Sequence, residues 1–310
     1  MRKYVTLEKA VGETPLVALE RYRRTHPELT NSSAEDFWMQ IPLLQALRRE
    51  RRMWRYGDES NMLKQRKVRQ KYPSMAYAGR LDPMASGKLL VLIGDECKEQ
   101  KKYHTLDKEY EFSVLFGVSS DTGDVLGRLR YETTAPEVSE ADLRHVPESL
   151  HGSMTLPYPH FSSKTIQGKP LHVWTLEGRL GEIEIPNYTA TIYALYCTGI
   201  TQKTGADIAD EALQKIETIP TVTEASKALG QDFRRKDVRA DWNTFRDEHG
   251  GDTYTIATFT CIASSGLYMR SLAEVIAEKI GTTGLAYHIH RKNIGIYQPF
   301  WKWGFWRKRY

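Results

Sequence analysis

Alternating apolar and polar positions indicate several β-strands along the chain. Residues 108–117 place Tyr110, Phe112, Val114 and Phe116 on one face, as the two-residue period of a strand requires. An unbroken apolar run at 89–93 indicates either a buried strand or a buried helix segment. Further β-rich segments occupy residues 4–7, 189–197 and 253–262.

Helical spacing and capping residues predict helices near both ends of the chain. Thr14 is suited to cap a helix that has Pro15 in its first turn. A second helix is expected to begin at Ser271 and to end at Gly281. Arg270 is therefore expected at the junction of a strand-linked loop and a helix N-terminus.

The segment 77–94 carries an acid in an unusual setting. Asp82 stands between a glycine-containing turn and Pro83, shortly before the apolar run. The proline favours an extended backbone at Asp82, and Gly87 allows a turn or the close approach of another chain segment. A carboxylate held this way can act as a nucleophile, and an ordinary Asp-Pro turn is an equally open interpretation.

Two loops are predicted between the central strands. The polar sequence 119–127 is typical of an exposed turn. In the segment 156–164, two prolines stiffen the chain and bring Lys164 onto a loop that can reach an anion.

Three stretches stand apart from this pattern. Residues 25–72 and 203–250 have the composition of insertions between core elements, and Thr221 with Glu224 forms a capping-box sequence near the middle of the second. The tail, 299–310, is aromatic and basic. It is interpretable as an arm that stacks on RNA or as a packed final strand, and the ready burial of large aromatic side chains favours packing.

Composition places the chain among ordinary globular proteins. It has 310 residues, of which 40% are hydrophobic and 27% charged, enough for a sizeable core. The absence of a membrane-length apolar run and of a signal peptide predicts a soluble, cytoplasmic protein. Three widely spaced cysteines suggest neither a disulfide framework nor a paired-cysteine zinc site; they are Cys97, Cys197 and Cys261.

Positive charge is concentrated in one window. The chain has a net charge of +5, whereas residues 48–71 hold ten basic side chains against three acids, a local charge of +7 that leaves −2 elsewhere. Interleaved aromatic residues favour a polyanion such as nucleic acid as the partner, and a solvated helix face is the alternative. The candidate RNA-binding residues here are Arg48, Arg51, Arg52, Lys64, Arg66 and Lys67.

The sequence lacks the motifs of several common kinds of site. The sequence has no phosphate-binding glycine loop with lysine, no dinucleotide-binding glycine motif, no His-Glu-x-x-His and no Gly-x-Ser-x-Gly. His288 and His290 would share a strand face but lack a third ligand, so no metal is expected. The remaining candidates suit a carboxylate nucleophile that acts on a bound polyanion without a cofactor. They are Asp82, Tyr110, Lys164 and Arg270.

Five segments together resemble the motifs of one enzyme family. Residues 79–87 read Gly-x-Leu-Asp-Pro-x-Ala-Ser-Gly, and the other four segments are 9–14, 107–124, 159–171 and 266–272. The first is similar to the catalytic motif of the TruB family of tRNA pseudouridine synthases, and the others are similar to the remaining family motifs in the same order.

This resemblance implies an α+β fold, the pseudouridine synthase fold. Its central mixed, mainly antiparallel sheet would have flanking helices and an active-site cleft, within one catalytic domain at residues 1–298. The implied activity is isomerisation of a T-loop uridine of tRNA to pseudouridine, without cofactor or metal, by a monomer. A synthase for ribosomal or other RNA, which Gly-Arg-Leu-Asp also resembles, and a non-catalytic RNA-binding or RNA-folding protein are the alternatives.

The resemblance also implies roles for individual residues. Asp82 would be the nucleophile, Tyr110 would stack on the target base and assist proton removal, and Arg270 would pair with Asp82 and keep it ionised. RNA contacts would come from Tyr77, Arg80, Lys164 and Tyr268. Tyr77 stands where the family usually has a histidine, and Arg80 where a small residue is usual.

Overall fold

A computed structural model describes residues 3–26, 74–221, 232–300 and 303–310. The basic window and Glu224 of the predicted capping box lie outside these residues. The chain divides into two compact units, interleaved along the sequence. Unit 1 comprises Met1–Glu8, Thr14–Arg80 and Leu89–His104, and unit 2 comprises Lys9–Glu13, Leu81–Lys88 and Thr105–Tyr310. The predicted catalytic domain, residues 1–298, stays a prediction.

Unit 1 is a small sheet with a helix, and its elements form where the pattern predicts them. The apolar run forms a strand, β3, not a helix, and Tyr77 of β2 pairs with its Val91. Thr14 caps α1 by accepting a hydrogen bond from the backbone N–H of Val17 at 3.2 Å, as expected. The elements are β1 (Tyr4–Lys9), α1 (Pro15–Thr25), β2 (Met75–Ala78), β3 (Ser86–Ile93), η2 (Gly94–Glu99) and α4 (Gln100–His104).

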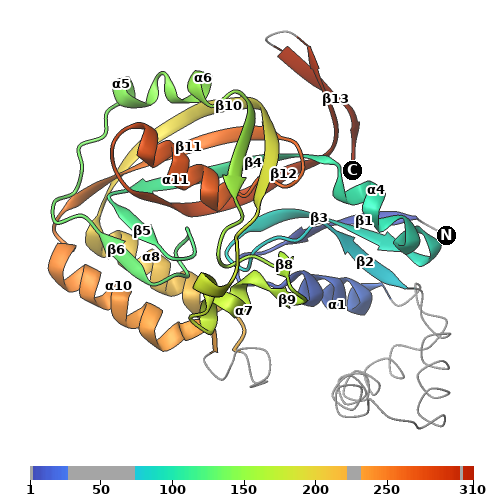
Figure 1. Cartoon of the computed structure of the whole chain (residues 1–310), viewed down its shortest axis with the longest axis horizontal. Coiled ribbons are helices and arrows are strands. Elements are labelled where there is room, and N and C mark those ends of the chain that lie inside the picture. The colour runs from blue at the N-terminus through green and yellow to red at the C-terminus, as the bar shows by residue number, and fades with distance from the viewer. Residues whose placement is uncertain (1–2, 27–73, 222–231, 301–302) are drawn as a thin grey trace. The chain divides into compact units, whose positions relative to one another are not determined.

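Unit 2 is built on a larger sheet with strand order β12-β4-β11-β10-β7 (Figure 1). All of these neighbours pair antiparallel, and β13 extends the sheet from β12. The start of β3 pairs with β12 in parallel, so the sheet is mixed and mainly antiparallel. The predicted α+β class is confirmed. The strands are β4 (Asp107–Phe116), β7 (Gly152–Pro157), β10 (Asn187–Thr204), β11 (Thr253–Ala263), β12 (Gly284–Phe300) and β13 (Trp303–Arg309).

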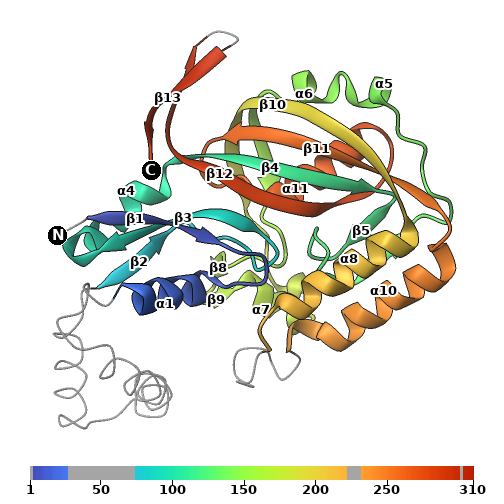
Figure 2. The same cartoon turned by 180° about the vertical axis from the view of Figure 1, so that it is seen from behind.

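Helices flank this sheet. α11 lies across one of its faces, and α8 and α10 run side by side in both views (Figures 1 and 2). The helices are α5 (Glu140–Leu143), α6 (Val146–Ser149), α7 (Leu171–Leu176), α8 (Gly205–Thr218), α10 (Arg235–His249) and α11 (Met269–Lys279), with short turns η3 (Leu180–Glu182) and η4 (Asp232–Arg234). Two small hairpins complete the unit, β5 (Val118–Ser120) with β6 (Leu129–Tyr131) and β8 (Thr165–Ile166) with β9 (Lys169–Pro170). None of the helices within the described ranges is long and apolar enough to cross a membrane.

The described residues of the stretch 203–250, which form α8 and α10, are integral to the core of unit 2. Trp242 and Phe245 of α10 are fully buried, and Ile208 of α8 joins the same cluster as the sheet strands. That this stretch is an insertion relative to other proteins stays a prediction. Within this chain, removing it would expose the core.

The turn at 119–127, expected to be exposed, is largely buried, so that prediction is wrong. Asp124 and Val125 have little or no exposed surface. The loop satisfies its own polar groups, because Asp124 accepts hydrogen bonds from the Thr122 hydroxyl at 2.6 Å and the Leu126 N–H at 3.0 Å. Trp242 covers it and donates from Nε1 to the Val125 carbonyl at 2.9 Å.

The aromatic tail forms the predicted final strand. β13 pairs with the end of β12, with Trp306 opposite Tyr297 and their rings 5.3 Å apart. Phe300 and Phe305, however, remain 71% and 56% exposed. The tail is therefore held by strand pairing, while one of its faces stays open to solvent.

Candidate active site

Asp82 lies in a tight turn of unit 2 that is flanked by buried apolar residues. The Ala85 N–H donates to the Asp82 carbonyl at 3.0 Å, and Leu81, Met84 and Ala85 are all within the core. The Asp82 side chain itself is 40% exposed. The fold therefore holds this carboxylate rigidly at the edge of the core, where a ligand can reach it.

Lys9 stabilises this turn through hydrogen bonds to backbone carbonyls. The residue is fully buried, and its Nζ donates to the carbonyls of Ala85, of Ala10 at 3.0 Å and of Pro83 at 3.3 Å. Burial lowers the pKa of Lys9 to about 8. Lys9 belongs to a matched sequence motif, but its contacts are not readable from the motif.

The predicted close approach at Gly87 is confirmed. Gly87 has φ +104°, and a Cβ there would lie 2.3 Å from the carbonyl oxygen of Arg291 on β12. Only glycine permits this backbone conformation and this pairing of β3 with β12.

Arg270 binds Asp82, as the resemblance implies. Its Nε donates to Asp82 Oδ2 at 2.8 Å, its Nη1 to the Thr122 carbonyl at 2.6 Å, and its Nη2 to the Phe161 carbonyl at 3.3 Å. The side chain is only 4% exposed and stands in the first turn of α11, which begins at Met269, two residues earlier than predicted. Burial opposes its charge, but nearby carboxylates outweigh burial, so the pKa of Arg270 is raised.

Asp124 is the site residue that sequence reasoning missed. Its Oδ2 lies 3.8 Å from Arg270 Nε, and its side chain is 5% exposed. Burial raises its pKa, and Arg270 opposes that rise. The Asp-Thr-x-Asp pattern was a usable signal, but the expected exposure of the turn hid the role of Asp124.

A third acid, Glu274, lies one helical turn after Arg270. Burial raises the pKa of Glu274 to about 7, although Arg270 acts in the opposite direction. A Cβ at Gly123 would lie 2.9 Å from Glu274 Oε1, so the loop and the helix pack closely here. Arg270 thus has acids on several sides, in a partly dehydrated setting.

The Asp82 carboxylate has one held and one available oxygen. Oδ2 is bound to Arg270, whereas Oδ1 makes no hydrogen bond to any residue that the structure describes. An oriented carboxylate with one available oxygen is chemically suited to act as a nucleophile or as a base.

Aromatic side chains gather beside Arg270. The ring of Tyr268 lies 5.4 Å from that of Tyr188 and 6.1 Å from that of Tyr158, and Lys164 Nζ lies 4.8 Å from the centre of the Tyr158 ring. Burial raises the pKa of Tyr268 to about 12. The structure therefore brings two predicted RNA-contact residues, Lys164 and Tyr268, into one cluster next to the pair.

The other predicted residues take part in none of the Asp82 or Arg270 contacts described above. Tyr110 lies on β4, half-buried against the core, and pairs with Arg291 of β12, which also pairs with Gly87. Tyr77 and Arg80 belong to unit 1, where Tyr77 packs against that unit's own apolar cluster and Arg80 is exposed. Arg48, Arg51, Arg52, Lys64, Arg66 and Lys67 lie outside the described residues. Among the described residues, no three His, Cys, Asp or Glu side chains are grouped to hold a metal ion.

A protein-family comparison matches the stretch of sequence that contains several candidate site residues. The family described as "TruB family pseudouridylate synthase (N terminal domain)" matches residues 65–217, which contain Asp82, Tyr110 and Asp124. Residues 65–217 of the chain belong to the TruB family. The family assignment extends the earlier resemblance from short motifs to a continuous stretch, while the roles of the site residues stay predictions.

Three curated relatives match between half and four fifths of the chain at low identity. It is 27% identical to tRNA pseudouridine synthase 4 of Saccharomyces cerevisiae over 80% of this chain and 67% of that protein. It is 32% identical to tRNA pseudouridine synthase B of Bordetella avium over 50% of this chain and 63% of that protein. The chain spans 58% of the corresponding protein of Caldicellulosiruptor saccharolyticus.

Solved structures also resemble the chain. A structure described as a Cbf5-Nop10-Gar1 complex covers 94% of this chain and 49% of its own, with a TM-score of 0.46 and 12% identity. An H/ACA RNP bound to a substrate RNA containing 2'-deoxyuridine covers 93% of this chain, with a TM-score of 0.43.

Proposed function

We propose that this chain is a tRNA pseudouridine synthase that isomerises a T-loop uridine, with Asp82 as the nucleophile. The observation that carries the proposal is the Asp82 carboxylate, bound to buried Arg270 at 2.8 Å through one oxygen and available through the other. Family membership and relatives named as tRNA pseudouridine synthases support the reaction class.

The reaction is an isomerisation, so atoms balance without a cofactor. The bond between the ribose carbon and the uracil nitrogen breaks, the detached base rotates, and a carbon–carbon bond to the ribose forms. The proton released from that ring carbon is replaced by one taken up on the nitrogen. Asp82 opens this sequence, and Arg270 orients its carboxylate and offsets part of the negative charge that RNA phosphates bring nearby.

The surrounding residues are proposed to hold the flipped base and its strand. Tyr110 stacks on the base and assists proton removal, and Tyr268 and Lys164 contact the RNA beside Asp82. Stacking on aromatic rings offsets part of the unstacking cost, which is about a few kcal/mol. Tyr77, Arg80 and the basic residues of the window 48–71 are proposed as further phosphate and base contacts.

Replacing Asp82 by asparagine tests the proposal. Asp82→Asn keeps the size of the side chain and its contact to Arg270 but removes the nucleophilic charge. We expect pseudouridine formation in a tRNA transcript to fall by about a thousand-fold or more, with RNA affinity retained. The assay is chemical mapping of pseudouridine after incubation, alongside a filter-binding titration.

The control is Asp95→Asn, which changes an exposed acid of unit 1 that pairs with Lys98 and should leave activity intact. Full activity of Asp82→Asn would refute the assignment of the nucleophile. Product in ribosomal RNA but not in tRNA would favour the alternative substrate. A wild-type protein that binds RNA but modifies none would favour a binding or folding function.

A further inference from the structure

The orientation of Arg270 depends on two loops that are distant in sequence. Its Nη1 and Nη2 donate to the carbonyls of Thr122 and Phe161, which lie in the loops 119–127 and 158–164. If either loop moved, an Arg270 donor would lose its acceptor, and the direction of Nε toward Asp82 would no longer be fixed.

Arg234 contacts both loops at adjacent positions. Its guanidinium binds both carboxylate oxygens of Asp121, with Nη2 3.0 Å from Oδ1 and a second bond from Nη1 to Oδ2. The same guanidinium carbon lies 4.5 Å from the centre of the Phe161 ring. Arg234 therefore contacts both loops at the Arg270 acceptors. It binds Asp121, which precedes Thr122, and it packs on Phe161, whose own carbonyl is the second acceptor.

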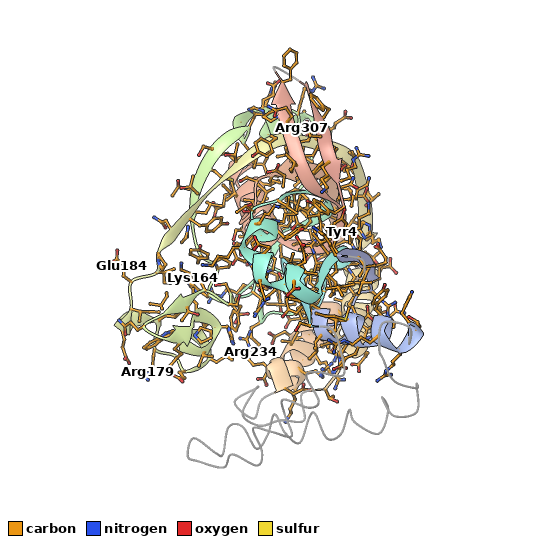
Figure 3. The ribbon with its side chains drawn as sticks, turned by 90° about the vertical axis from the view of Figure 1, so that its right-hand side faces the viewer. Tyr4, Lys164, Arg179, Glu184, Arg234 and Arg307 are labelled. Carbon is orange, nitrogen blue, oxygen red and sulfur yellow. The ribbon has the colours of Figure 1, made fainter. Side chains whose placement is uncertain are left out.

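The backbone of Arg234 and the helix that follows it are held in place. Arg234, labelled in Figure 3, is the N-cap of α10 and has a left-handed backbone, φ 59° and ψ 28°, which is uncommon outside glycine. α10 is anchored by Trp242, which bonds to Val125, and by Asp241, which accepts from the Leu129 N–H at 3.0 Å. The guanidinium is largely shielded, with the side chain 15% exposed.

We propose that Arg234 is a positioning residue for the Asp82–Arg270 pair. It joins the two loops from outside so that both carbonyls stay in place as Arg270 acceptors. Arg234 makes no recorded contact with Asp82 or Arg270 and acts only through the loops. The inference rests on the proposed function, because its consequence is measured as uridine isomerisation.

The test replaces the guanidinium and separates turnover from RNA binding. For Arg234→Met we expect kcat to fall about 10- to 100-fold, as small displacements of catalytic groups do, with KM changed less than about threefold. Arg234→Lys should recover part of kcat, because the ammonium can still pair with Asp121. Thermal unfolding of each variant shows whether the fold is retained.

Asp121→Asn offers a second route to the same loss that leaves α10 intact. The double variant with Arg234→Met should be no slower than the worse single variant, because each substitution removes the same Arg234–Asp121 ion pair. The matched control is Arg246→Met, a change within α10. It removes an exposed ion pair with Asp210 of α8 and should leave kcat unchanged.

The outcomes separate this inference from the proposed function. An unchanged kcat in folded Arg234→Met, with Asp82→Asn inactive, would overturn the inference alone. A raised KM at constant kcat would assign Arg234 to RNA binding and would also overturn it. If Asp82→Asn were active, the proposed function would fail first.

Discussion

Two arginine–aspartate pairs of unit 2 differ in what surrounds them. Arg128 binds Asp241 through two bonds, with Nε 2.6 Å from Oδ2 and Nη2 3.1 Å from Oδ1. Arg270 makes only one bond to Asp82, at 2.8 Å. By ion-pair geometry alone, the Arg128 pair is the better of the two.

When the two pairs are ranked by the cost of losing them, burial makes the Arg270–Asp82 pair the more important. The Arg128 side chain is 46% exposed, so water can replace Asp241 if the pair opens. The Arg270 side chain is only 4% exposed, and its remaining donors bind the carbonyls of Thr122 and Phe161. The comparison shows that an ion pair matters most where its loss leaves other buried polar groups without partners.

The largest effect is expected from Arg270→Met. Removing the guanidinium leaves Asp124 and two carbonyls uncompensated, so the free energy of unfolding should fall by about 3 to 5 kcal/mol. Pseudouridine formation should be lost as well. Urea unfolding measures the first and product mapping the second, and Arg270→Lys, which keeps the charge, should retain more stability. A loss below about 1 kcal/mol would remove the distinction between the two pairs.

An intermediate, pH-dependent effect is expected at Glu274. Its pKa is raised from 4.5 to about 7 in the folded protein. Between these values the folded state binds more protons than the unfolded state, so this group lowers stability as pH rises from 4.5 to 7. Glu274→Gln should remove that fall, which is up to about 3 kcal/mol.

Urea titrations at several pH values in this window measure the difference between wild type and variant. Glu99→Gln, which changes an exposed acid of η2 in unit 1, is the matched control. A difference that does not change with pH would show that the Arg270 surroundings do not penalise the charge of Glu274.

The smallest effect is expected from Arg128→Ala. An exposed pair contributes about 0 to 1 kcal/mol even with good geometry, and salt screens part of it. Unfolding measured at low and high salt should show a loss that shrinks with salt. A salt-independent loss above about 3 kcal/mol would place Arg128 in the same class as Arg270.

The sequence by itself determined most of the local structure. The alternation at Tyr110 to Phe116 produces β4, Thr14 caps α1, and Gly87 permits the close approach of β12, because period, capping and backbone sterics act over a few residues. The five ordered motifs also identified the family. Whether the run at 89–93 forms strand or helix was left open, since periodicity does not separate them.

Only the tertiary structure decided how the candidate site is assembled. The partners of Arg270 are separated from it in sequence by 188 positions at Asp82, 148 at Thr122 and 109 at Phe161. Turn composition predicted an exposed loop around Asp124, but burial depends on Trp242 covering that loop from more than a hundred positions away. Local sequence patterns do not specify which distant groups will accept hydrogen bonds from a buried donor such as Arg270. The hydrogen bonds of Arg270 to those distant groups are what orient the Asp82 carboxylate.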